Sequence, residues 1–116
     1  MADIPFLNPT ILKQLDLPVP NRETTPKLLE VLNLNREYIP NKEIKAYQRL
    51  YGFDQLDCLH WQGLIEMPLF KLHTQVFQPK VEKIKGTVCL LHGYLEHSGI
   101  YQPIIKELLE QGFSVV

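Results

Sequence analysis

The sequence has no long apolar run and no basic stretch ahead of one. No uninterrupted apolar run exceeds about five residues, whereas a membrane-spanning helix needs roughly twenty, so we predict no transmembrane segment. The first ten residues carry Asp3, Pro5 and Pro9 and lack the basic segment with which a secretory signal begins. A cytoplasmic location is therefore the expectation.

The sequence also has few cysteines and almost no net charge. Two cysteines, Cys58 and Cys89, do not make the disulfide framework of a small secreted protein. Cys89 lies in an apolar run, where we expect it to be buried as a free thiol. Twelve Lys and Arg residues against thirteen Asp and Glu give a net charge of −1, which argues against nucleic acid as a partner. An apolar fraction of 45% and a charged fraction of 22% are those of a folded globular chain.

Residues 1–59 are predicted to form a helical N-terminal extension. Six of the nine prolines fall in the first 40 residues, which favours short helices over long ones. A helix over residues 27–34 is indicated by Thr25 as a cap, followed by a proline and an apolar periodic stretch. A second helix is indicated over residues 41–51, with Gly52 past its end.

From His60 onward the pattern changes from helical spacing to alternation. Residues 70–76 predict a half-buried strand that ends at Pro79, and residues 60–67 predict a strand before it. Pro68 falls where a hairpin connection is expected. The two sides of the later strand carry different residues: Phe70, Leu72, Thr74 and Val76 on one, and Lys71, His73 and Gln75 on the other.

The last third of the chain predicts a strand, a helix and a second strand. Residues 87–91 are typical of a strand buried on both faces. Gly112 ends the helix, and residues 113–116 begin the second strand. The apolar positions of the helix recur at helical spacing: Ile100, Ile104, Ile105, Leu108 and Leu109. Such a unit of about 30 residues has parallel strands and a right-handed crossover, so the fold class is α/β, with a hairpin followed by a parallel βαβ unit.

Residues 92–99 form the loop after the first of these parallel strands. Ligands bind beyond the carboxyl ends of the strands in open parallel sheets, because backbone donors and helix N-termini converge there. The loop reads His-Gly-Tyr-Leu-Glu-His-Ser-Gly, a polar segment flanked by glycines between two apolar elements. A loop that only turns the chain is the alternative reading.

The sequence of this segment resembles that of the α/β-hydrolase family. The pattern His-Gly-x-x-Glu-His-Ser-Gly-x-Tyr, between a buried strand and an amphipathic helix, is similar to the branch of monoacylglycerol lipases, lysophospholipases and S33-like serine aminopeptidases. Residues 108–116 resemble the helix end and next strand of the same branch. The resemblance covers residues 86–116 and implies that residues 60–116 are the N-terminal portion of an α/β-hydrolase domain, truncated before the nucleophile elbow.

The resemblance also implies a role for the loop. Acyl transfer through a serine places negative charge on a carbonyl oxygen, and the family stabilises that charge with two backbone N–H groups, one of them from this loop. By position that donor is the N–H of Tyr94. Gly93 then allows a tight turn and close approach of the substrate. The remaining loop-support residues are His92, Glu96 and His97, and we expect Ser98 to cap the following helix.

The catalytic residues themselves are not found in this sequence. The only serines, Ser98 and Ser114, do not lie in a Gly-x-Ser-x-Gly motif. The nucleophile, acid and base are therefore expected beyond Val116. A metal site is not expected at His92, Glu96 and His97, because three residues rather than two separate the first pair of the inverted zinc motif.

The activity implied by the resemblance is that of a serine hydrolase. It would cleave a small-molecule or lipid carboxylic ester, such as a lysophospholipid or monoacylglycerol, through an acyl-serine intermediate and without a cofactor. Peripheral contact with a membrane surface and the oligomeric state stay open. The alternatives are a non-catalytic binding or assembly module that uses the loop and a free sheet edge, or the same fold with epoxide, peptide or haloalkane chemistry.

Overall fold

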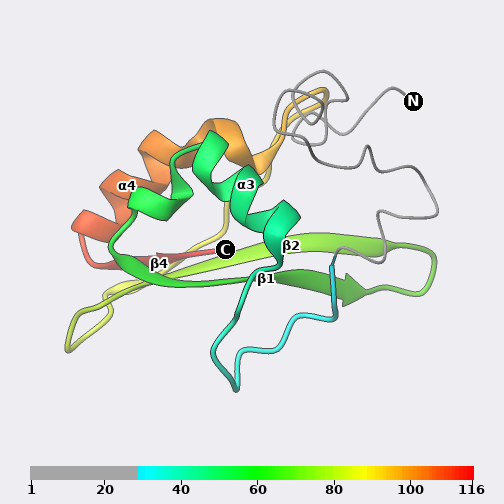
Figure 1. The fold of residues 1–116 in the computed structure, drawn as a ribbon. Helices are drawn as coiled ribbons and strands as arrows, with labels where there is room; N and C mark the ends of the chain where they lie inside the picture. Colours follow the sequence, from blue (N-terminus) through cyan, green and yellow to red (C-terminus); the bar gives the residue numbers. More distant parts are fainter. Residues whose placement is uncertain (1–28) are drawn as a thin grey trace.

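A computed structural model describes residues 29–116, which form a mixed sheet of four strands in the order β1-β2-β4-β3. The two α-helices, α3 and α4, lie on the same side of the sheet (Figure 1). Both are too short and too polar to cross a bilayer, and no other helix of the described residues can do so.

Helix α3 spans Lys42–Leu50 and begins and ends where local chemistry allows it. The Oδ1 atom of Asn41 accepts a hydrogen bond of 2.9 Å from the Ile44 N–H, which satisfies a donor that the first turn leaves free. After the last turn, Gly52 adopts a φ of +76°, a left-handed conformation that glycine tolerates best. The helix predicted over residues 41–51 is therefore confirmed.

The helix predicted over residues 27–34 is wrong in its described part. From Leu29 onward the chain runs irregularly across the edge of β1, where Leu32 N–H donates to Leu64 O at 2.9 Å and Leu64 N–H donates to Glu30 O at 2.8 Å. These bonds replace those of a helix. Gly63 makes the approach possible, since a Cβ atom there would lie 2.7 Å from Leu32 Cα. The start of the predicted helix lies outside the described residues.

Strands β1, Cys58–Glu66, and β2, Lys71–Pro79, form the antiparallel hairpin that alternation predicts. Met67 N–H donates to Phe70 O at 2.9 Å across the connection, which contains Pro68 as expected. Their pairing continues without interruption over the full length of both strands.

The side of β2 that faces the helices is the more polar one. Phe77 packs in the core and Gln75 is buried beneath α3, whereas Phe70 and Leu72 are exposed on the opposite side. The alternation in the sequence is therefore correct. The polar side of β2 lies under the helices, and its apolar side does not.

Strands β3, Gly86–Val88, and β4, Phe113–Val115, are parallel and are connected by the 3₁₀ turn η3, Ser98–Tyr101, and helix α4, Gln102–Glu110. Gly112, with a φ of +90°, ends α4 and turns the chain into β4. The predicted parallel βαβ unit is confirmed. Strand β4 also pairs with β2 in antiparallel fashion, which joins the unit to the hairpin.

The prediction that residues 87–91 are buried on both faces is wrong. Within residues 29–116, strand β3 is the last strand of the sheet order and pairs only with β4. Cys89 is exposed rather than buried, and both it and Cys58 are free thiols. Leu91 is 84% exposed, whereas Leu90 packs partly against the core.

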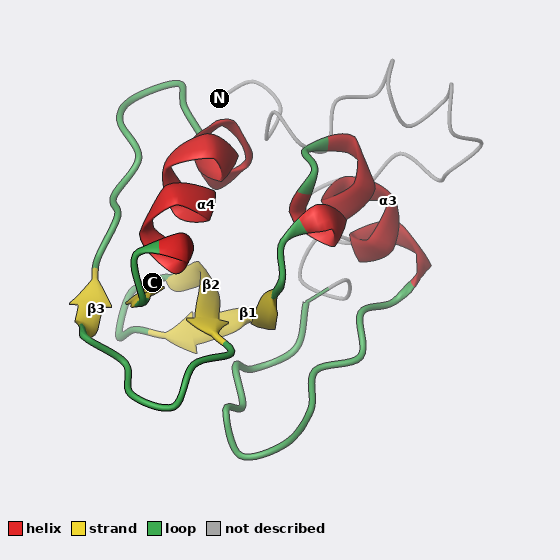
Figure 2. Ribbon diagram, turned by 90° about the vertical axis from the view of Figure 1, so that its left-hand side faces the viewer, coloured by secondary structure: helices red, strands yellow, loops and turns green. Residues whose placement is uncertain are grey.

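The core lies between the sheet and the two helices (Figure 2). The 3₁₀ turn η2, Phe53–Gln55, adds Phe53, whose ring centroid lies 5.3 Å from that of Phe77. Helix α4 directs only part of its predicted apolar face inward, since Ile104 is exposed. The buried hydrophobic residues that pack together are Tyr47, Phe53, Phe77, Ile105, Leu109 and Val115.

Candidate functional site

The loop of residues 92–99 follows β3 and leads into η3 at the carboxyl end of the parallel strands (Figure 2). It contains a β-turn from Gly93 to Glu96, in which Glu96 N–H donates to Gly93 O at 3.1 Å. Leu95, at the third position, has a φ of +61°, the only positive φ of a non-glycine residue in the described chain. A positive φ at that position is the signature of a type II turn. Leucine adopts it at a cost of about 1 to 2 kcal/mol.

The carboxylate of Glu96 holds the start of this turn. Its Oε2 atom accepts hydrogen bonds from Gly93 N–H at 2.9 Å and from the Tyr101 hydroxyl at 2.6 Å. The bond from Tyr101, and then the bond from Gly93, lower the pKa of Glu96. The same bond raises the pKa of Tyr101. A Cβ atom on Gly93 would lie 3.1 Å from Oε2, so glycine leaves room for the carboxylate.

Tyr94 occupies the second position of the turn. Its N–H donates no hydrogen bond within residues 29–116, and a β-turn engages the N–H of its fourth residue rather than its second. The side chains of Tyr94 and Leu95 are 88% and 74% exposed. The turn therefore leaves the N–H groups of Tyr94 and Leu95 without an acceptor in residues 29–116, between the N–H groups of Gly93 and Glu96, which are bonded.

The two loop histidines have different surroundings. His92 is exposed, and its Nδ1 atom lies 3.1 Å from Gly93 O. His97 is buried, and its Nδ1 atom accepts a hydrogen bond of 3.1 Å from Gly99 N–H. Its ring packs edge-on against that of Tyr51, with the ring centroids 4.8 Å apart. Burial is the main reason that the pKa of His97 is lowered.

No group of three or more metal-ligating side chains comes together in the part of the chain that the structure describes.

Ser98 does not cap the following helix, contrary to prediction. His97 is the N-cap of η3, since its side chain accepts from Gly99 N–H. The Ser98 Oγ atom instead lies 2.6 Å from Gln75 Nε2, which donates to it, and 3.2 Å from the Tyr47 hydroxyl. Ser98 thus connects the loop to β2 and α3.

Gln75 and Tyr47 belong to a buried polar cluster that sequence reasoning missed. His60 Nε2 lies 2.9 Å from Gln75 Oε1, and Gln48 Nε2 lies 3.4 Å from His60 Nδ1. Burial lowers the pKa of His60 to about 4 and raises that of Tyr47 to about 12. The available signal was that these polar residues of the predicted hairpin share one side of it with Phe77.

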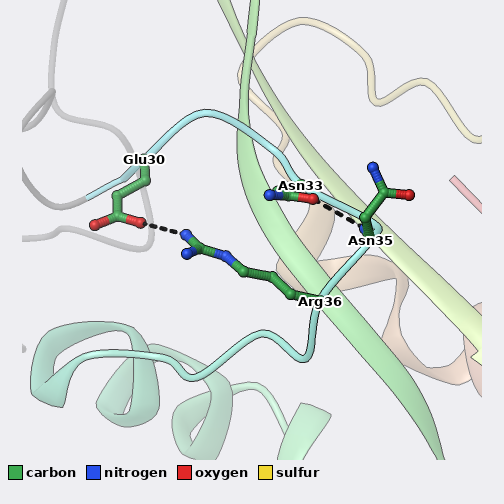
Figure 3. A network of polar contacts seen from close by, with 4 residues as sticks. All are labelled: Glu30, Asn33, Asn35 and Arg36. Carbon is green, nitrogen blue, oxygen red and sulfur yellow. Dashed lines mark hydrogen bonds and ion pairs between the residues drawn. The ribbon is translucent and has the colours of Figure 1, made fainter.

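A second polar network lies in the segment before α3 (Figure 3). Arg36 and Glu30 form an ion pair at 3.3 Å, and Asn33 Oδ1 accepts from Asn35 N–H at 2.9 Å. Trp61 Nε1–H donates to Arg36 O at 2.9 Å and ties the segment to β1. Both charges are largely exposed to solvent, so the pair contributes little to stability. It shapes a loop and assembles no reactive group.

Comparison with known families supports a hydrolase. Residues 82–116 match the family model described as serine aminopeptidase, S33, which covers β3, the loop, α4 and β4. The mixed sheet with helices is compatible with the N-terminal part of an α/β-hydrolase. Comparisons with curated proteins and with solved structures found no match.

Proposed function

We propose that this chain is the N-terminal part of a serine hydrolase and that the backbone N–H of Tyr94 is one of the two donors of its oxyanion hole. The observation that carries the proposal is the free Tyr94 N–H in the turn of residues 93–96, within the segment that matches a serine hydrolase family. Attack of a serine on an ester carbonyl places negative charge on the carbonyl oxygen. Backbone donors that are already oriented stabilise that charge without reorganising.

The residues around Tyr94 hold the donor in place under this proposal. Glu96 fixes Gly93 N–H, Gly93 leaves space for the carboxylate, and His92 bonds to Gly93 O. His97 anchors the far end of the loop against Tyr51. None of these side chains is proposed as the nucleophile or the base.

The nucleophile, acid and base are proposed to follow Val116, so that residues 60–116 are the first portion of the catalytic domain. The proposed substrate is a carboxylic ester of the lysophospholipid or monoacylglycerol kind. The exposed apolar side chains of Tyr94 and Leu95 beside the donor suit an acyl chain. The reaction needs no cofactor, and the proposal includes a cytoplasmic location.

A pair of substitutions at one position tests the donor in the protein translated from the complete gene. Tyr94→Pro removes the N–H, and proline is favoured at the second position of a type II turn, so the turn is retained. Tyr94→Ala keeps the N–H and removes the side chain. We expect Tyr94→Pro to lower kcat on a nitrophenyl ester by about 10²- to 10³-fold, as loss of one oxyanion donor does.

Tyr94→Ala should change kcat far less than Tyr94→Pro. Equal losses in the two variants would contradict a role for the backbone donor. Labelling with a fluorophosphonate probe tests the serine independently. A complete protein that takes no label has no activated serine, and that result would favour the non-catalytic binding module.

A further inference from the structure

We propose that Gln75 is a positioning residue for the oxyanion loop and holds the Tyr94 turn in place through Ser98. The inference rests on the proposed function for its catalytic consequence. The contact itself is independent of catalysis. It connects a buried side chain of β2 to a loop more than twenty residues later in the sequence.

The amide of Gln75 is fully engaged. Gln75 is 6% exposed, and its Nε2 atom donates to Ser98 Oγ at 2.6 Å and to the Tyr47 hydroxyl at 3.2 Å. An amide nitrogen has two hydrogens, so both are used. Its Oε1 atom faces His60 Nε2 at 2.9 Å.

The orientation of the Gln75 amide determines the tautomer of His60. A carbonyl oxygen only accepts, so His60 must carry its proton on Nε2 to bond with Gln75. His60 Nδ1 is then an acceptor for the amide of Gln48 in α3. Burial keeps His60 neutral near pH 7, because its pKa falls to about 4. One series of donors therefore runs from Gln48 in α3 through His60 and Gln75 in the hairpin to Ser98 in the loop, and Gln75 also donates back to Tyr47 in α3.

Ser98 lies at the more closely packed end of the loop. The flanking residues His97 and Gly99 are buried. A Cβ atom on Gly99 would lie 2.7 Å from His97 Cε1 and 2.8 Å from Tyr51 Cγ, so the backbone is closely packed there. The turn of residues 93–96 precedes this anchored end directly. Loss of the Ser98 contact removes one of the interactions that hold this end of the loop, beside those of His97 and Glu96.

Two substitutions and one control separate positioning from simple core packing. Gln75→Met keeps the length of the side chain and removes its hydrogen bonds, and Ser98→Ala removes the other partner with a small change in volume. Gln78→Met makes the same substitution on the same strand, at a half-buried position of the opposite face. All are made in the complete protein.

The first readout does not depend on activity. The Glu96 pKa reports the turn, because the bonds from Tyr101 and Gly93 lower it. An NMR titration should show this pKa rising toward its ordinary value in Gln75→Met and in Ser98→Ala, but not in Gln78→Met. An unchanged Glu96 pKa in both test variants would overturn the inference, even if the melting temperature falls.

The second readout is kinetic. We expect kcat to fall by at least about tenfold in each test variant, since small displacements of catalytic groups have large effects. KM should change little. The double variant should be no slower than the worse single one, because both act through one contact. Additive losses would contradict action through Ser98. A parent protein that cleaves no ester would refute the proposed function, and the Glu96 titration would still decide the contact.

Discussion

The Tyr101 hydroxyl lies 2.6 Å from Oε2 of Glu96, the same oxygen that accepts the N–H of Gly93. One carboxylate oxygen thus joins the first residue of the turn to η3. Both donors stabilise the negative charge of Glu96. Hydrogen bonds to the charged form lower a carboxyl pKa. As the pH falls through the lowered pKa of Glu96, both bonds weaken and the turn loses this support.

Removing the Tyr101 hydroxyl should raise the pKa of Glu96. Tyr101→Phe deletes the donor that contributes most to the lowered value and keeps the ring. A ¹³C NMR titration of the Glu96 carboxyl measures the change. Tyr38→Phe is the control, since this ring lies in the segment before α3. A Glu96 pKa that stays as low in Tyr101→Phe as in the parent would show that the hydroxyl does not carry the effect.

Replacing Leu95 with asparagine should stabilise the protein. Leu95 has a φ of +61° and is largely exposed, so the substitution relieves backbone strain and removes little buried surface. Asparagine tolerates the left-handed region better than leucine, and we expect a gain of about 0.5 to 1 kcal/mol in the free energy of unfolding. Urea denaturation measures it. Leu91→Asn, at an exposed position without a positive φ, should change stability by less than about 0.5 kcal/mol.

Loss of the α3 cap should destabilise the protein. Asn41→Ala removes the acceptor for Ile44 N–H and is expected to cost about 1 kcal/mol. Asn41→Asp keeps an acceptor oxygen at the cap and should retain most of the stability. Equal losses in both variants, measured by denaturant unfolding, would argue that the cap bond is not the source of the effect.

Acid should destabilise the fold through its buried histidines. Burial lowers the pKa of His60 and of His73 from 6.5 to about 4. Between these values the unfolded chain binds protons that the folded chain does not, so the free energy of unfolding rises with pH across this window. The loss at the acid end is on the order of 3 kcal/mol for each histidine.

Unfolding free energies measured at several pH values between 4 and 7 test this dependence. His60→Gln removes one titrating group and keeps an amide that can donate to Gln75. Its slope between pH 4 and 6.5 should be smaller than that of the parent. A parent whose stability is flat across this range would contradict burial of neutral histidines.

Several elements were predictable because short-range chemistry specifies them. Asn41 and Gly52 delimit α3, Pro68 marks the hairpin connection, and Gly112 separates α4 from β4. Each depends on residues close together in the sequence. The conformational preference of a cap, a proline or a glycine is sufficient to predict them.

The segment after Leu29 and the burial of β3 depended on longer-range contacts. Helical spacing before Leu34 was overridden by hydrogen bonds to β1, which become available only when Gly63 admits the chain. Cys89 directly follows β3 and is exposed, and β3 lies at the end of the strand order among residues 29–116. An apolar run in the sequence does not show how many neighbours its strand has.

The candidate site was predictable to a similar degree. Glu96 and Gly93 lie within one short motif, and the structure brings them together as a local turn. The partners of Ser98 come from β2 and α3, so nothing near Ser98 in the sequence indicates them. Polar residues such as Gln75 are ordinarily assigned to the solvent side of a strand, and here that side is covered.

The polar face of the hairpin restricts how its strands can slide past each other. A slip of one residue would turn Gln75 away from the helices and bring Leu72 and Val76 beneath them. Apolar side chains accept many such offsets, because their contacts are not directional. Donors and acceptors that must meet within about 3 Å accept very few. The buried amides and imidazoles thus favour one register of β1 against β2, and hairpins in other registers are disfavoured while the chain folds.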